Sequence, residues 1–395
     1  MSELKVSVKK IVDVKHHPNA DRLDCAKVDG WEVIVPRNNF ANDDLVVFIP
    51  PDAILNQNLH EFLGVTKYCA DLPKIDRERP TSKRVKATRL RGERSYGVIV
   101  SLATLYDYLN KHRSEIFSQI TDECGPWGYP TLNQFIKSIK EEQDFTEHLD
   151  ITKFEPIEKC QDGDREKQNP FFHKYTSIEK WQNYTNILEE DEQVVVLSKI
   201  HGQNIRVGYL DTPQYSGWVA GSHRIQRKEK DAHDRDSKFW LPLKDNNLKK
   251  LITAIKEGPD NDNIIVFAEL YGDGIQDMTY DCQPGEIKYR VFDISVNREY
   301  KNWQYVQNMC CLFDVPLVPI IYLGPYSSSL INAYTDGPCL VCHPDKIRSK
   351  FKGREGIVIK PTTERKSKDL PEDGRVILKS VSVDYLNRKG GTDNA

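Results

Sequence analysis

The sequence predicts an α+β protein in which a small all-β barrel precedes a larger domain of antiparallel sheets flanked by helices. Three observations predict this class. The first 100 residues carry short β-branched runs between turn residues, an acidic stretch with helical periodicity follows, and strand-like and helix-like segments alternate after residue 170. The length of 395 residues suits two or three domains.

Residues 1–100 contain most of the short strand-like runs. Val6–Val14 alternates apolar and polar residues, as a half-buried strand does. Trp31–Val35 and Leu45–Ile49 are short apolar runs bounded by glycine, proline and Asn-Asp-Asp turns, and Ser95–Val100 closes the set. Short strands at this density indicate a small barrel of the OB type.

Residues 101–168 differ in character and are predicted to be a helical, acidic connecting segment. Leu102–Phe117 and Leu132–Glu142 are the two predicted helices. The run from 141 to 166 is rich in acidic residues and has few large apolar ones, so we expect a flexible linker there.

Residues 169–395 form the predicted larger domain. Helices are expected at Asn246–Glu257, where Asn246 is a candidate cap and the apolar residues share one face, and at Asn302–Phe313. The predicted strands are Val194–Leu197, Ile205–Leu210, Ile264–Leu270, Tyr289–Ile294, Val318–Leu323, Gly356–Lys360 and Val376–Leu378.

The charge balance argues against nonspecific coating of nucleic acid. The formal net charge is −3 and the pI is about 6.4, so any contact with phosphate must use local patches. One such patch is a basic run that only Glu93 opposes, and an ordinary solvated face is the alternative interpretation. The run consists of Lys83, Arg84, Lys86, Arg89, Arg91 and Arg94. We expect its members from Lys83 to Arg91 to contact nucleic acid.

The chain has the sequence features of a protein of the cytoplasm or nucleus. No apolar stretch is long enough for a transmembrane helix, and the first residues lack an apolar signal core, so no membrane partner is expected. The nine cysteines are scattered and odd in number, which does not suggest a disulfide framework.

Lys199 is the strongest candidate for a nucleophile. It follows a β-branched strand and precedes Gly202 and a second strand, so it is expected at a tight turn at the end of a strand. A lysine amine attacks phosphorus when burial or neighbouring cations favour its neutral form. A surface lysine in a turn is the ordinary alternative for this residue alone.

Further polar and aromatic residues stand at other strand edges. Glu269 lies near the end of an apolar strand, Glu355 begins another, and Lys360 and Lys379 end strands. Phe292 sits in a strand and can stack on a base. Nucleotidyl transfer needs carboxylates for Mg²⁺, lysines for phosphate charge and an aromatic face for the base. Each residue alone is compatible with ordinary structure.

The order of these motifs resembles the covalent nucleotidyltransferase superfamily, which contains ATP-dependent ligases and mRNA-capping guanylyltransferases. The matching segments are Lys199-Ile200-His201-Gly202-Gln203-Asn204, Ser222-His223-Arg224, Glu269 in Glu-Leu-Tyr-Gly-Asp-Gly, Phe292, Glu355 in Glu-Gly-Ile-Val-Ile-Lys360, and Lys379. The resemblance implies a ligase-type nucleotidyltransferase fold across residues 169–395.

The resemblance also implies roles for these residues. Lys199 would carry AMP, Phe292 would stack on adenine, and Glu355 and Glu269 would lie at a Mg²⁺ or Mn²⁺ site. Ile200, His201, Asn204, Arg224, Glu269, Lys360 and Lys379 would complete the ATP-binding set. The final motif departs from many relatives, because Ile377 stands where they carry a lysine, and Arg375 or Lys360 are the candidates to supply that charge.

Two features favour an RNA ligase within this superfamily. His201 replaces the aspartate usual in DNA ligases and capping enzymes and resembles the motif of nick-sealing RNA ligases. The segment from His17 to Asp21, with Trp31–Val35 and Ala87–Gly92, resembles the OB module at the front of one RNA ligase group. Residues 380–395 are too few for a second barrel after Lys379, where DNA ligases and capping enzymes carry theirs.

The sequence therefore predicts an ATP-dependent RNA ligase that joins 3′-OH and 5′-phosphate ends at nicks. The expected partner is RNA or an RNA-containing nicked duplex, with no obligate protein partner evident. His201 has two interpretations, as a hydrogen-bonding group near the nucleophile or as a residue that only fixes the turn. The alternative functions are a capping-type guanylyltransferase and a non-catalytic RNA-binding protein with a degenerate ligase domain.

Overall fold

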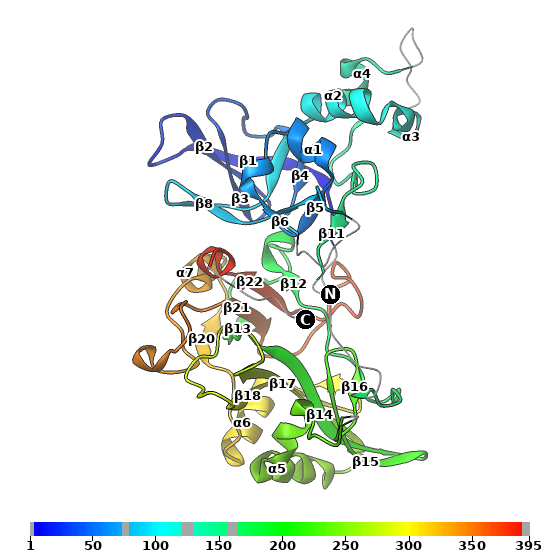
Figure 1. Ribbon diagram of the computed structural model, residues 1–395, viewed down its shortest axis with the longest axis vertical. Coiled ribbons are helices and arrows are strands. Elements are labelled where there is room, and N and C mark those ends of the chain that lie inside the picture. Colours follow the sequence, from blue (N-terminus) through cyan, green and yellow to red (C-terminus); the bar gives the residue numbers. More distant parts are fainter. Residues whose placement is uncertain (1–3, 73–78, 121–128, 156–163, 232, 389–395) are drawn as a thin grey trace. The chain divides into compact units, whose positions relative to one another are not determined.

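A computed structural model describes residues 4–72, 79–120, 129–155, 164–231 and 233–388 (Figure 1). Contacts within the chain define two compact units. Unit 1 comprises Met1–Glu155 with Trp181–Thr185, and unit 2 comprises Pro156–Lys180 with Asn186–Ala395. Both units combine helices with antiparallel strands, which confirms the α+β class, while the predicted divisions at residues 100 and 168 stay predictions. Among the described residues, no helix is long and apolar enough to cross a membrane.

Unit 1 is built on two main antiparallel sheets. The first has the order β10-β4-β1-β2-β3, with β1 (Ser7–His16), β2 (Leu23–Val28), β3 (Trp31–Pro36), β4 (Leu45–Ile49) and β10 (Val98–Ser101). The second has the order β11-β5-β7-β6, with β5 (Ala53–Leu55), β6 (Cys69–Asp71), β7 (Lys83–Val85) and β11 (Thr152–Lys153). A separate hairpin joins β8 (Thr88–Leu90) to β9 (Glu93–Ser95).

The strand expected at Ser95–Val100 is interrupted by a close approach of the backbone. Gly97 has φ +77° and divides the run between the end of β9 and the start of β10. A Cβ atom there would lie 2.4 Å from the carbonyl oxygen of Ile49, so only glycine fits without a shift.

The helical segment after β10 packs into the core of unit 1. Its elements are α2 (Leu102–His112), η2 (Ser114–Ile116), α3 (Phe117–Ile120) and α4 (Leu132–Ser138), and α1 (Gln57–Phe62) and η1 (Thr66–Tyr68) precede it. Ser101 caps α2 by accepting a hydrogen bond from the Thr104 amide. Leu105, Leu109 and Phe135 share a buried cluster with the barrel residues Val8 and Val47.

The expected flexible linker at 141–166 is wrong for its first part. Phe145, Leu149 and Ile151 are at most 4% exposed and belong to the same core. The amide of Phe145 donates to the Val6 carbonyl at 2.7 Å, which ties this segment to β1. The acidic residues of this segment alternate with apolar residues that are buried in the core of unit 1. Residues 156–163 of the expected linker lie outside the described residues.

Unit 2 contains two larger sheets. One has the order β16-β15-β14-β17-β18-β19, with β14 (Gln203–Thr212), β15 (Tyr215–Ser222), β16 (Gln226–Arg227), β17 (Asn263–Gly272), β18 (Ile287–Val296) and β19 (Glu299–Tyr300). The other has the order β12-β22-β21-β13-β20, with β12 (Glu179–Lys180), β13 (Gln193–Lys199), β20 (Ile320–Pro325), β21 (Gly356–Pro361) and β22 (Leu378–Val381). Each predicted strand of this region overlaps one of these elements. The run predicted at 376–378 overlaps β22 only at Leu378, and the run predicted at 318–323 overlaps β20 from Ile320.

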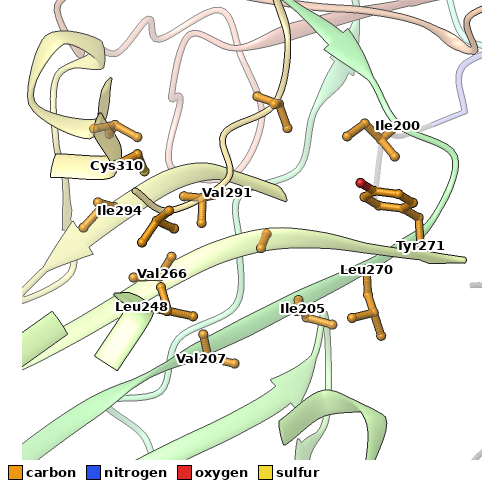
Figure 2. Close-up of a cluster of buried hydrophobic side chains, with 14 of the residues drawn as sticks. Ile200, Ile205, Val207, Leu248, Val266, Leu270, Tyr271, Val291, Ile294 and Cys310 are labelled. Atoms are coloured by element: carbon orange, nitrogen blue, oxygen red, sulfur yellow. The ribbon is translucent and has the colours of Figure 1, made fainter. Parts of the chain in front are cut away.

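Helices cover the core of unit 2. They are α5 (Asn246–Lys256), α6 (Trp303–Leu312), α7 (Ser329–Thr335) and α8 (Val383–Leu386), with η5 (Lys238–Lys244) and η6 (Pro344–Lys346). The short helix η4 (Trp181–Asn183) belongs to unit 1. Figure 2 shows Leu248 of α5 and Cys310 of α6 packed with Val207, Val266 and Ile294 from three strands. The apolar face predicted for α5 is buried, but its cap is Asp245 rather than Asn246.

Strand register brings the candidate residues of unit 2 together. Lys199, the last residue of β13, pairs with Gly356, the first residue of β21. Glu355, which immediately precedes Gly356, is therefore close to Lys199. In the other sheet, Asn204 of β14 pairs with Glu269 of β17. Antiparallel pairing thus places residues from distant parts of the sequence at adjacent strand ends.

Candidate active site

Lys199 and Glu355 form the centre of the site. The Lys199 ammonium donates a hydrogen bond to Oε1 of Glu355 at 2.6 Å, and its side chain is 27% exposed. Burial acts to raise the pKa of Glu355, but the charge of Lys199 and its hydrogen bond outweigh burial and lower the pKa. Glu355 is therefore an anion held by the candidate nucleophile.

Glu269 is a second carboxyl group near this pair. Burial and, to a lesser extent, the charge of Glu355 raise its pKa to about 8, although Lys199 and a hydrogen bond from the Gly202 amide act in the opposite direction. Glu269 and Glu355 thus differ in protonation near neutral pH. Such separated pKa values are typical of functional sites.

A cavity extends from Lys199 between the two sheets of unit 2. It is lined by Tyr175, Ile178, Leu197, Ser198, Lys199, Ile200, Asn204, Glu269, Phe292, Val318, Val358, Lys360 and Ile377. Its volume of about 80 Å³ is below the roughly 300–1,000 Å³ of typical small-molecule sites. A ligand larger than this volume would therefore extend beyond the cavity.

The aromatic and aliphatic walls of this cavity suit a flat base. Phe292 is half-buried, and its ring packs edge-on against Tyr175 with centroids 5.0 Å apart. Ile377, which replaces the lysine of many relatives, is 2% exposed and belongs to a cluster with Phe172 and Tyr175. This position contributes an apolar wall in place of a cation.

The two cations proposed to compensate for Ile377 are engaged elsewhere. The Lys360 ammonium lies 3.0 Å from Oδ2 of Asp293, and Arg375 lies 2.6 Å from the same oxygen. Glu364 accepts from both, and all these groups are largely buried. Lys360 still lines the cavity, whereas Arg375 does not.

His201 belongs to a buried hydrogen-bond network. Its backbone amide donates to the Tyr280 hydroxyl at 2.7 Å, its Nε2 lies 2.9 Å from Asp277, and its Nδ1 lies 2.7 Å from the Tyr385 hydroxyl. Arg388 also bonds Asp277 at 2.8 Å. Burial is the largest cause of the lowered His201 pKa, so the neutral ring is favoured. In the neutral tautomer protonated on Nε2, this nitrogen donates to Asp277 and Nδ1 accepts from Tyr385, and Nη2 of Arg388, which lies 3.1 Å from Nε2, donates to Asp277 instead.

Two buried oxygen atoms without a hydrogen-bond partner in the described part of the chain indicate that the site near Lys199 can accept a divalent cation. Oε2 of Glu355 and Oδ1 of Asn204 are buried and have no hydrogen-bond partner among the described residues. Oxygen ligands of this kind suit Mg²⁺ or Mn²⁺. No group of three or more His, Cys, Asp or Glu residues in the described ranges could hold a metal ion alone, so substrate oxygens and water would complete the shell.

Four predicted residues are not among those that line the cavity, namely Arg224, Lys379, His201 and Glu355. Arg224 is exposed on the turn between β15 and β16, and Lys379 is half-buried in β22 opposite Val358. The remaining predicted nucleotide-binding residues line the cavity, and His201 directly follows Ile200 of its wall. The roles of all of them stay predictions.

The basic run 83–91 lies in unit 1. Lys83 pairs with Asp71, and the Arg84 guanidinium lies 4.4 Å from the Phe154 ring centroid. Lys86 is half-buried, whereas Arg89 and Arg91 are exposed at the β8–β9 hairpin. Nη1 of Arg89 donates to the Gly92 carbonyl at 3.1 Å, so exposure alone distinguishes these two hairpin residues from the rest of the run.

Sequence reasoning missed several residues of the site. Asp277, Tyr280, Tyr385 and Arg388 surround His201 but carry no local motif. Asp293 is the exception, because it follows Phe292 in an otherwise apolar strand, and a buried charge in such a strand signals a paired partner.

Comparisons with known proteins agree with this architecture. Residues 192–381 match the RNA ligase family model, and residues 5–102 match an OB-fold domain model. No curated protein sequence matches the chain.

The fold is similar to that of an RNA ligase from Naegleria gruberi. A mutant of that enzyme with AMP and Mn has a TM-score of 0.68 at 20% identity, covering 97% of this chain and 98% of that chain. A mutant with ATP and Mn has a TM-score of 0.67, and the enzyme with pyrophosphate has a TM-score of 0.66, at the same identity and coverage. The chain therefore has the fold of that ligase, with a match to the RNA ligase family model at residues 192–381 and to an OB-fold domain model at residues 5–102.

Proposed function

We propose that this protein is an ATP-dependent RNA ligase that joins 3′-OH and 5′-phosphate ends at nicks through a Lys199–AMP intermediate. The observation that carries the proposal is the contact of Lys199 with Glu355 at the edge of a cavity that also holds Glu269 and Phe292. The match to the RNA ligase family model and the ATP, AMP and pyrophosphate present in the similar Naegleria structures support it.

The first step is transfer of AMP to the lysine. Adenine enters the cavity against Phe292, and the phosphates project past Lys199. The ammonium loses a proton to solvent, which its 27% exposure permits. The amine nitrogen then attacks the α-phosphorus and loses a second proton to solvent, an N–P bond forms, and the P–O bond to pyrophosphate breaks.

Two further transfers complete joining. An oxygen of the RNA 5′-phosphate attacks the AMP phosphorus, so the N–P bond breaks and the lysine recovers its protons. The 3′-oxygen of the adjoining strand then attacks the activated 5′-phosphorus, loses its proton and releases AMP. The energy of one ATP phosphoanhydride bond is thus carried into one phosphodiester.

Glu355 and Glu269 are the residues that would hold a divalent cation. Glu355 has a free buried oxygen, and Asn204 lies beside Glu269 across the strand pair. Mg²⁺ or Mn²⁺, when bound, would screen the phosphate charges and favour the neutral amine of Lys199. The Naegleria structures with ATP or AMP contain Mn, which supports this assignment.

Labelling with radioactive nucleotide tests the proposal. The wild-type chain with Mg²⁺ should become labelled by α-labelled ATP but not by α-labelled GTP, and Lys199→Ala should abolish the label. Labelling by GTP alone would indicate a guanylyltransferase. Absence of any adduct on a folded wild-type chain would indicate a non-catalytic protein.

A further inference from the structure

A second cavity of unit 2 stands apart from the nucleotide cavity. Its volume is about 540 Å³, within the roughly 300–1,000 Å³ of typical ligand sites. The segment 166–171 forms one wall, and β16, the β14–β15 hairpin and η5 form the others. No residue is shared with the cavity at Lys199.

Four aromatic side chains line this second cavity. They are Phe171, Tyr215, Trp218 and Trp240. Phe171 is 38% exposed and Tyr215 is 37% exposed, and both belong to the same cavity wall rather than standing singly on the surface. The exposed rings can act as platforms on which flat bases stack.

Hydrogen bonds hold the walls in place. Nε1 of Trp240 donates to the Arg227 carbonyl at 2.9 Å, and the Tyr215 hydroxyl donates to the Trp218 carbonyl at 2.8 Å. The Asn169 amide donates to Oε1 of Gln226 at 2.8 Å, which fixes the segment 166–171 against β16. The platforms are therefore formed before any ligand binds.

Exposed cations lie in the cavity wall and on an adjoining turn. Lys167 and Lys228 line the cavity and are exposed, and Arg224 is exposed on the turn that joins β15 to β16. Within the described ranges, the side chains of these three residues have no ion-pair or hydrogen-bond partner. Each is available for a phosphate group.

The other polar groups suit base edges. Gln214 offers an amide donor and acceptor, and Glu166 and Glu229 offer acceptors. The Gln168 side chain instead donates to the Phe172 carbonyl, and Oδ1 of Asn169 accepts from the Phe171 amide, so these two residues shape the wall. The two carboxylates oppose the lysines, so net charge alone does not attract a polyanion strongly here. Recognition must combine stacking with a few phosphate contacts, which single strands allow and paired duplexes do not, because their bases are already stacked.

We propose that this cavity, which we name the aromatic groove, binds a single-stranded stretch of RNA. Bases stack on Phe171 and Tyr215, and phosphates contact Lys167 and Lys228. The choice of RNA as the ligand rests on the proposed RNA ligase function. The groove adds a site that binds unpaired substrate away from Lys199.

Fluorescence anisotropy of a labelled, unstructured RNA oligonucleotide on the full chain tests the groove. Phe171→Ala and Tyr215→Ala should each weaken binding about tenfold. Phe171→Trp should retain binding, because it keeps a stacking surface. Tyr129→Ala, a control at an exposed tyrosine of unit 1, should bind as wild type does.

Salt dependence gives an independent test of the phosphate contacts. Lys167→Gln and Lys228→Gln should each reduce the slope of log K against log salt by roughly 0.7. A fully paired RNA duplex should compete poorly with the single strand. Unchanged RNA affinity in both alanine variants, or equal competition by the duplex, would overturn the proposal.

ATP labelling of Lys199 separates this inference from the proposed function. The groove variants should be labelled at the wild-type rate, since no groove residue lines the nucleotide cavity. If the wild type binds RNA through the groove but is never labelled, the ligase assignment fails and the groove stands. If labelling succeeds while the groove variants bind RNA normally, the groove fails and the ligase assignment stands.

Discussion

The Lys199 ammonium and Oε1 of Glu355 lie 2.6 Å apart, although 156 positions separate the two residues in sequence. The contact depends on the pairing of Lys199 with Gly356 at the ends of β13 and β21. It places a carboxylate with one free oxygen beside the candidate nucleophile.

Removal of the Glu355 charge should slow adenylylation strongly. Glu355→Gln keeps the shape of the side chain but removes the anion that orients Lys199 and would hold the cation. We expect a loss of about 100-fold or more in the single-turnover rate of Lys199–AMP formation. Glu299→Gln, at an exposed carboxylate of β19, is the matched control. A rate near that of wild type would contradict the assigned role.

Glu269 should make the stability of the ligand-free protein depend on pH. Its pKa of about 8 lies above its ordinary value of 4.5, so the native state retains a proton that the unfolded state has lost. Stability should therefore fall as the pH rises from about 4.5 to about 8. Urea unfolding at pH 5 and pH 8 should show a smaller fall for Glu269→Gln. Equal falls in both proteins would contradict the raised pKa.

The Tyr385 hydroxyl should stabilise the network around His201. Tyr385→Phe leaves Nδ1 of a buried imidazole without its donor, which should lower the free energy of unfolding by about 1–3 kcal/mol. Tyr322→Phe removes an exposed hydrogen bond to the Pro325 carbonyl and should have a much smaller effect. Chemical denaturation compares the two, and equal losses would argue against a structural role for the network.

The cluster around Asp293 should be a major determinant of stability. Asp293→Asn leaves Lys360 and Arg375 buried without their central anion, which should cost about 3–5 kcal/mol of unfolding free energy. Asp211→Asn disrupts an exposed pair with Lys256 and should change stability little. Similar midpoints for wild type and Asp293→Asn in denaturant would refute this expectation.

The local chemistry of the site was predictable because it follows strand edges. Lys199 at the end of β13, Glu269 within β17 and Glu355 before β21 are placed by apolar runs that also fix the strands. Phe292 is placed in the same way by β18. Short-range pattern therefore placed these residues on strands, whereas their selection as one set rested on the resemblance of the motif order to the nucleotidyltransferase superfamily.

The partners of these residues were not predictable in the same way. His201 contacts Asp277 and Tyr385, which lie 76 and 184 positions away, and no periodicity encodes that meeting. Arg375 was a candidate for phosphate, but its pairing with Asp293 depends on how β18 and the segment before β22 pack. The exposed position of Arg224 likewise follows from the turn after β15.

A pulse-chase experiment tests the central claim most directly. The protein is labelled with α-labelled ATP, freed of nucleotide, and then mixed with Mg²⁺ and a nicked duplex that has an RNA 3′-OH and a 5′-phosphate. We predict that the label leaves Lys199, appears on the 5′-phosphate and is released as AMP when the nick is sealed. Label that stays on the protein while the nick remains open, or sealing that persists in Lys199→Ala, would contradict the account.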